Sequence, residues 1–127
     1  MAYALMVITL AAFALTTVGV GALLGRLPRN SWAGIRLPVI MASEDAWMRA
    51  HRAAGPMMIF GGVAAFAISL AFVPFALADK VSDGATLIVV LTCAGILIGT
   101  AFSTAIIAVS VAQQAPKPPK TPKVPKA

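Results

Sequence analysis

Residues 84–115, GATLIVVLTCAGILIGTAFSTAIIAVSVAQQA, decide the fold class, because this stretch contains no charged side chain. The hydrocarbon core of a bilayer is about 30 Å thick, and about 20 apolar helical residues cross it. An unpaired backbone amide is costly in lipid, so a crossing segment must be a helix or a strand of a closed barrel. The stretch is too long for a barrel strand and shows no alternation of apolar and polar residues. The sequence therefore predicts a membrane-spanning helix here.

Two further stretches, residues 1–25 and 53–78, are also free of charge. Hydrophobic residues make up 60% of the chain and charged residues only 11%, whereas soluble domains carry about 25% charged residues. We therefore predict an all-α membrane protein with spans at about 2–24, 53–78 and 85–112. The first span is expected to be retained rather than cleaved as a signal peptide. It has no basic segment before it, and its apolar run is longer than the roughly 7–15 residues of a signal sequence.

The basic residues predict an orientation. Nine of them lie in the loop 26–52 and in the C-terminal tail, and only Lys80 lies between the second and third spans. Because positive charge is retained on the cytoplasmic side, we expect loop and tail to be cytoplasmic and Met1 to be outside. The net charge of +6 is thereby explained without nucleic acid, and no aromatic residues alternate with the lysines of the tail.

The loop 26–52 is expected to be ordered and to hold a short amphipathic helix. Two prolines and a glycine argue against a continuous helix over residues 26–38. Ser43 is a suitable N-cap residue, and the acidic Glu44 and Asp45 suit the positive end of a helix dipole. Asp45 and Arg49 are spaced for an ion pair. We expect a helix to begin near Glu44 and to continue into the second span.

Within the spans, glycines mark candidate packing sites and prolines candidate ends. Gly21 and Gly25, and likewise Gly95 and Gly99, have the small-xxx-small spacing that lets helices approach closely. Their partner is left open by the sequence: each other, the second span or a neighbouring protein. Gly61-Gly62 is a third candidate. Pro56 and Pro74 are expected near the ends of the second span, and Asp83-Gly84 is expected to form the turn of an antiparallel hairpin.

The loop and the start of the second span resemble the SdpI family of small bacterial membrane proteins. The resemblance is carried by Pro28-Arg29-Asn30-x-Trp32-x-Gly34-Ile35-Arg36-x-Pro38, by Ser43-x-x-Ala46-Trp47 and by His51-Arg52-x-x-Gly55. It implies a small multi-pass protein of a bacterial cytoplasmic membrane. The family is named after an immunity protein that protects a bacterium from a secreted peptide toxin and captures a repressor at the membrane. Leu37 and Ile40 stand where the family usually has threonines, which implies that a polar binding surface has become a packing surface here.

Several residues of the loop are candidate contacts for lipid phosphate or a partner protein. An arginine fork suits phosphate, which the cytoplasmic headgroup layer supplies, and tryptophan suits the membrane interface. In the alternative interpretation, the same residues cap helix ends and pair with Glu44 and Asp45 inside the loop. The candidates are Arg29, Asn30, Trp32, Arg36, Trp47, His51 and Arg52.

We predict no catalytic, cofactor-binding or metal-binding residue, and no enzymatic activity. His51 is the single histidine, and is expected to form a hydrogen bond within the loop or to lie at the interface. Cys93, the single cysteine, lies within the third span, where it is expected to be a small buried residue. Glu44 and Asp45 are adjacent, and neighbours on a helix do not face each other. No charged residue lies at the centre of a span, which argues against an ion pathway.

We divide the chain into a membrane domain, residues 1–115, and a proline-rich tail, residues 116–127. The tail is expected to be an extended, polyproline-like arm whose lysines recur at every third position and form a ladder that would suit an acidic groove on a neighbouring protein. These lysines are Lys117, Lys120, Lys123 and Lys126. Our first hypothesis is therefore a non-enzymatic accessory subunit of a larger membrane complex, of which a respiratory assembly is one example. The alternative is an immunity-type protein that binds a peptide toxin.

Overall fold

The computed structural model describes residues 1–116, and in this part of the chain the regular structure is entirely helical. The helices are α1 (Ala2–Leu23), α2 (Pro38–Met41), α3 (Glu44–Leu77) and α4 (Asp83–Ala112). Helices α1, α3 and α4 are each long and apolar enough to cross a membrane, which confirms the predicted all-α fold with three spans. The tail lysines lie outside the described residues.

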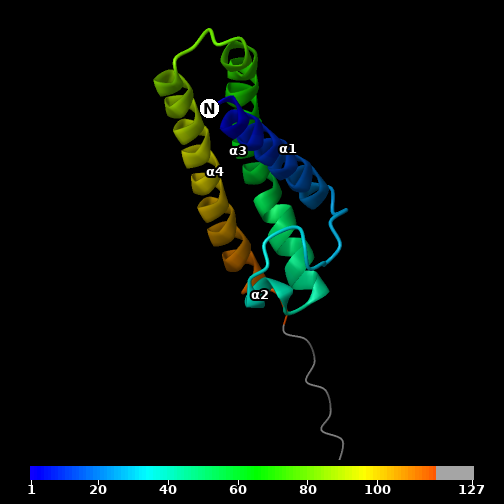
Figure 1. Cartoon of the computed structure of the whole chain (residues 1–127). Helices are drawn as coiled ribbons and strands as arrows, with labels where there is room; N and C mark the ends of the chain where they lie inside the picture. Colours follow the sequence, from blue (N-terminus) through cyan, green and yellow to red (C-terminus); the bar gives the residue numbers. More distant parts are fainter. Residues whose placement is uncertain (117–127) are drawn as a thin grey trace, which may run out of the picture.

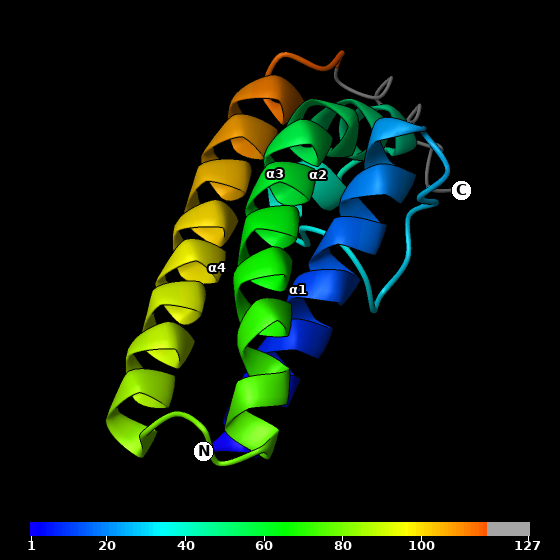
Figure 2. The ribbon, with the colours of Figure 1, turned by 90° about the horizontal axis from the view of Figure 1, so that it is seen from above.

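Helix α3 is the central element of the bundle. Helix α1 packs along one side of it and α4 along the other, whereas α1 and α4 touch each other much less (Figures 1 and 2). Helices α3 and α4 form the predicted antiparallel hairpin. The N-terminus lies toward the end of the bundle that carries the α3–α4 turn, and the segment 26–43 begins at the opposite end and runs back beside α1 (Figure 2).

The tandem glycines of α3 are the points where its two neighbours approach, as predicted. A Cβ atom on Gly61 would collide with the Thr100 side chain of α4, and one on Gly62 would collide with Thr16 of α1. The α1–α3 contact continues at Gly55, where an added Cβ would lie 2.9 Å from the Leu23 nitrogen. Consecutive residues on a helix point about 100° apart, so one Gly-Gly pair serves both interfaces.

The other glycines are used differently from the predicted packing stripes. Gly21, Gly95 and Gly99 have nothing within 4 Å of an added Cβ, so they contact neither of the other spans. Gly25, at φ +67°, ends α1: its N–H bonds to the Ala22 carbonyl and the next N–H reaches Gly21, the paired bonds of a Schellman cap. Spacing identifies residues on one face, but it does not say which face meets a partner.

The α3–α4 turn lies earlier than expected. Asp83-Gly84 is the first part of α4 and not the turn, because the Ser82 hydroxyl accepts a hydrogen bond from the Ala85 N–H and so caps the helix at Ser82. The chain reverses over residues 78–82 instead. Asp79 ends α3 with φ +51°, a left-handed conformation that normally favours glycine.

Both prolines lie inside the long helix α3. Pro56 lies twelve residues after Glu44, and Pro74 lies in the last turn of the helix. At 1.5 Å per residue the 34 residues of α3 extend about 51 Å, well beyond a hydrocarbon core of about 30 Å. The Glu44 end therefore projects beyond the span, with Pro56 near the membrane boundary, and both views show the helix bending near this position (Figures 1 and 2).

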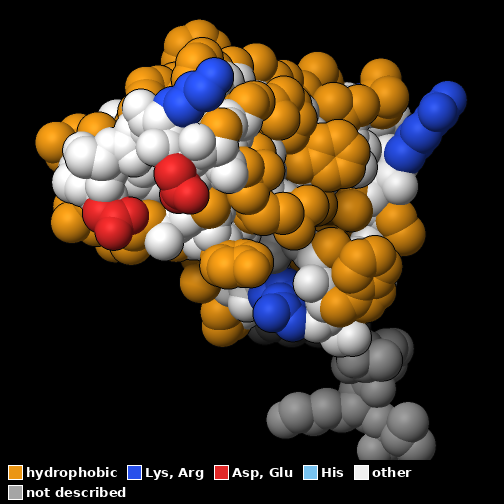
Figure 3. Space-filling view, turned by 45° about the horizontal axis from the view of Figure 1, so that its top comes forward, with side chains coloured by type: hydrophobic (Ala, Val, Ile, Leu, Met, Phe, Trp, Pro, Cys, Tyr) orange, Lys and Arg blue, Asp and Glu red, His pale blue; other side chains and the backbone are white. Residues whose placement is uncertain are grey.

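The outer surface of the bundle suits a lipid environment. Figure 3 shows a face on which hydrophobic side chains predominate and charged side chains occur only in small, separate groups. Large apolar side chains are exposed on all three long helices, among them Leu10, Phe60, Ile88 and Phe102. The protein is a multi-pass membrane protein.

Candidate functional site

The region that carries the candidate residues is a folded cap, which we define as residues 26–52. The apolar core of the cap packs against Ala108 of α4. This core is formed by Ile40 of α2 and by Ala46, Trp47 and Ala50 at the start of α3. Ile40 is fully buried, as expected for a position that has become part of a packing surface, whereas Leu37 stays partly exposed. The Ser43 hydroxyl accepts a hydrogen bond from the Ala46 N–H at 3.0 Å, which confirms the predicted N-cap.

Trp47 anchors the cap to the end of α1. Its side chain is fully buried, and its indole Nε1 donates a hydrogen bond to the Leu27 carbonyl at 2.8 Å. The bond joins residues twenty positions apart, so it fixes where the chain runs after it leaves α1. Because a buried indole N–H requires an acceptor, Trp47 both fills the core and sets the path of the loop.

His51 holds the next part of the loop and acts as a neutral acceptor. Its Nε2 accepts a hydrogen bond from the Ile35 N–H at 2.8 Å, and its Nδ1 lies 2.9 Å from the Trp47 carbonyl. Since a backbone N–H can only donate, Nε2 must be unprotonated and the proton lies on Nδ1. Burial lowers the pKa of His51, an effect that the bond to the Trp47 carbonyl partly opposes. The prediction of a hydrogen bond within the loop is confirmed.

Gly34 permits this contact. It has φ +99°, and a Cβ atom there would collide with His51 Nε2 and lie 3.0 Å from the Trp47 ring. The Trp47 and His51 rings stack at a centroid distance of 3.9 Å. Only a glycine fits at this position, both because of its backbone conformation and because of the space left by the two rings.

Asn30 shapes the turn that precedes Gly34. Its Oδ1 accepts from the N–H groups of Trp32 and Ala33, at 3.0 and 2.7 Å, and its amide donates to the Pro28 carbonyl at 2.8 Å. The side chain thus satisfies three backbone groups in a segment that has no regular structure. Asn30 is a structural residue here.

The arginines are tied to the cap by single or weak contacts. Arg29 donates to the Met41 carbonyl at 3.0 Å and lies 3.7 Å from the Glu44 carboxylate. Arg36 donates to the Ser31 carbonyl, and Arg52 to the Leu23 carbonyl at 3.4 Å. The predicted pair of Asp45 and Arg49 is present at 2.8 Å. Within the described residues, Arg36 and Arg52 have no acidic partner.

Trp32 differs from the other candidates because it takes no part in the core. Its side chain is 81% exposed, although its backbone is held by Asn30. It lies on the rim of a cleft of about 620 Å³ between α1, α4 and the cap. The cleft is lined by Trp32, Ala33, Gly34 and Ile35 of the cap, by Ala14, Leu15 and Val18 of α1, by Met58 of α3, and by Ala101, Thr104 and Ala105 of α4.

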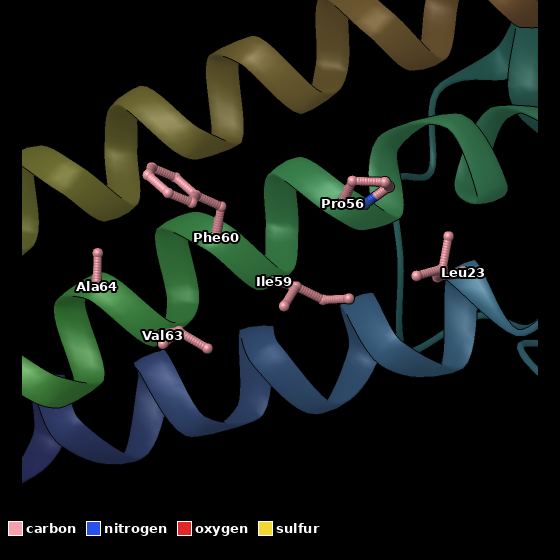
Figure 4. Close-up of a pocket in the computed structure, with 6 residues that line it drawn as sticks. All are labelled: Leu23, Pro56, Ile59, Phe60, Val63 and Ala64. Carbon is pink, nitrogen blue, oxygen red and sulfur yellow. The ribbon is translucent and has the colours of Figure 1, made fainter.

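A second hollow lies along the α1–α3 seam. It has a volume of about 550 Å³ and is lined entirely by apolar residues: Leu23, Pro56, Ile59, Phe60, Val63 and Ala64 (Figure 4). Neither hollow was predicted from the sequence. Apart from Thr104, the lining residues of the spans are ordinary apolar residues, and only the helix packing brings them together.

Within residues 1–116, no group of histidine, cysteine and acidic side chains is arranged to hold a metal ion. Cys93 is buried in the α3–α4 interface, with its Sγ 3.7 Å from the Ala65 carbonyl, as expected of a small core residue. The candidate residues are therefore brought together as a folded structural unit that leaves one tryptophan and several guanidinium donors exposed.

The sequence model of the SdpI/YfhL protein family matches residues 26–111. The match covers the cap, α3 and α4, and it leaves out α1. No match was found among curated proteins, and none among solved structures.

Proposed function

The chain belongs to the SdpI/YfhL protein family, and from this premise we propose that it is a non-enzymatic accessory subunit that binds a larger membrane protein complex. The observation that carries the proposal is the outer face of α4. Gly95 and Gly99 lie one helical turn apart on this face with nothing within 4 Å of an added Cβ. Small residues of this spacing let a second helix approach closely.

Large apolar side chains frame these two glycines. Ile88, Phe102 and Ile106 lie on the same side of α4 and are 67–70% exposed. A partner helix could fill a shallow notch between large side chains by close packing. Lipid chains would make no comparably specific contact there. No helix among the described residues fills the notch. We therefore place the principal contact with the partner on this face.

Co-purification tests the proposal. Gly99→Leu would fill the notch and should lower recovery of the partner complex in mild detergent at least ten-fold. Gly21→Leu is the matched control, because Gly21 is equally open but lies on α1. The proposal fails if wild-type protein purifies without a larger complex, or if both variants retain the complex equally.

We also propose that the cap is cytoplasmic and that the tail, which lies outside the described residues, makes a second contact with the complex. An impermeant thiol reagent should label Ser82→Cys from outside intact cells and should not label Ser31→Cys. Deletion of residues 116–127 should weaken co-purification while leaving the spans folded. The opposite labelling pattern would reverse the proposed orientation.

An immunity-type role is the second candidate, and the exposed Trp32 favours it. This residue belongs to the pattern shared with the family, yet it has no role in the core of the cap. A protein of this kind should raise survival against a peptide toxin, and Trp32→Ala should remove that protection. Survival that depends on Trp32 but not on Gly99 would favour this role over the accessory subunit.

A further inference from the structure

We infer that the cleft between α1, α4 and the cap binds one acyl chain of an anionic phospholipid of the surrounding leaflet, with the lipid phosphate held at Arg36. This site is distinct from the outer face of α4, so it can be tested independently of the proposed function. The shape of the cleft, the charge beside its lining segment and its position along the span all favour this ligand.

The cleft fits a narrow apolar ligand. Its volume of about 620 Å³ lies in the range of small-molecule sites, about 300–1,000 Å³. A helix with its side chains is 10–12 Å wide and rises 5.4 Å per turn, so one turn occupies roughly 400–600 Å³. The cleft would therefore accept little more than one turn of a partner helix. A single acyl chain is much thinner and would extend along the Ala14, Val18 and Ala101 wall.

Arg36, which has no acidic partner among the described residues, directly follows the segment that lines the cleft. Arg36 donates to the Ser31 carbonyl and thereby closes the turn whose residues 32–35 line the cleft. The guanidinium group has five donors, so several remain for a phosphate. The two acidic residues of the cap face Arg29 and Arg49 instead. An anion at the rim would therefore meet positive charge without a competing carboxylate from the described residues.

The position of the cleft matches the two parts of a phospholipid. Leu15 and Val18 lie eight and five residues before the end of α1, which corresponds to about 12 and 8 Å into the helix. This part of the cleft lies at the depth of acyl chains, and the exposed Arg36 directly follows the lining residue Ile35. Trp32 lines the same cleft four residues before Arg36, and an exposed indole suits the boundary between hydrocarbon and headgroups.

Quenching of Trp32 fluorescence measures the lipid in the cleft. The protein is placed in mixed vesicles of phosphatidylglycerol and phosphatidylcholine, in which one lipid or the other carries brominated acyl chains. The buried Trp47 adds a constant background to the fluorescence. The Trp32→Phe variant, in which Trp47 is the remaining tryptophan, measures this background alone. One cation near the surface corresponds to about a five-fold preference for the anionic lipid. We expect such a preference in the wild type, and it should weaken in high salt.

Three variants make the experiment decisive. Arg36→Gln should abolish the preference, whereas Lys80→Gln, which removes the same charge at the opposite end, should retain it. Ala101→Phe fills the cleft without altering the cap or the charge, and should reduce quenching by both lipids. Equal quenching by both lipids in the wild type overturns the inference. The inference is also overturned if Arg36→Gln and Lys80→Gln have equal effects, or if Ala101→Phe leaves the quenching unchanged. It is overturned as well if neither lipid quenches Trp32 in the purified complex.

Discussion

The cap and the membrane spans keep their shapes by different means. In the cap, buried polar groups form specific hydrogen bonds: the Trp47 indole donates to the Leu27 carbonyl, and His51 accepts from the Ile35 N–H. In the spans, small residues let helices approach, and the threonine hydroxyls bond to backbone carbonyls of their own helix, as Thr16 does to Ala12. The motif residues that carry the resemblance to the family lie mainly in the cap. Most of them therefore specify a fold, and the residues that the fold leaves unused, above all Trp32, are the ones available for binding.

The largest effect should separate the two tryptophans. Trp47→Ala removes a fully buried ring and its hydrogen bond, so we expect a loss of about 3–5 kcal/mol in the free energy of unfolding. Trp32→Ala removes an 81% exposed ring, and should change stability by less than about 0.5 kcal/mol. Thermal unfolding of both variants in detergent measures the difference. Similar losses for the two would contradict the assignment of Trp47 to the core and Trp32 to the surface.

A smaller effect should separate the glycines of the spans. Gly61→Ala forces a methyl group against Thr100, and overpacking of this kind costs about 1–3 kcal/mol. Gly95→Ala meets no atom of this chain, so the purified protein should be as stable as the wild type or slightly more stable. If Gly95→Ala destabilised the isolated protein, the outer face of α4 would not be free in the way described.

His51 should give the cap a dependence on pH that the spans lack. Because burial lowers its pKa in the folded state, the unfolded chain takes up a proton first, near the ordinary value of 6.5. The contribution of His51 to stability is complete above about pH 6.5, and it is lost as the pH falls from there towards the lowered pKa. Unfolding temperature measured against pH should decline below 6.5 in the wild type. In His51→Gln this decline should be absent, and its persistence would assign it to other groups.

The smallest effect concerns the end of α3. Asp79 adopts a left-handed conformation at φ +51°, so Asp79→Gly should stabilise the α3–α4 hairpin by about 0.5 kcal/mol. The same change at Asp83, which has ordinary helical geometry in the first turn of α4, should destabilise the protein. Paired melting curves of the two variants test this. Shifts in the same direction would show that the backbone at Asp79 carries no strain.

The parts of this structure that depend on neighbours in the chain could be predicted from the sequence. The three spans follow from charge-free length, and the Ser43 cap and the Asp45–Arg49 pair follow from spacing within one turn. The bond from Trp47 to Leu27, and the fit of Gly34 against His51, join residues that only the tertiary fold brings together. Spacing likewise showed that Gly95 and Gly99 share a face, but it gave no means to decide that this face points away from the bundle.

We propose that the outer face of α4 binds a partner protein, and photo-crosslinking in native membranes would detect this contact. A photoreactive phenylalanine analogue replaces Phe102, which is 70% exposed beside the Gly95–Gly99 notch, or Phe60, which is 75% exposed on α3. We expect position 102 to form a crosslink with one discrete polypeptide and position 60 to yield chiefly lipid adducts. Lipid adducts alone from both positions would contradict it.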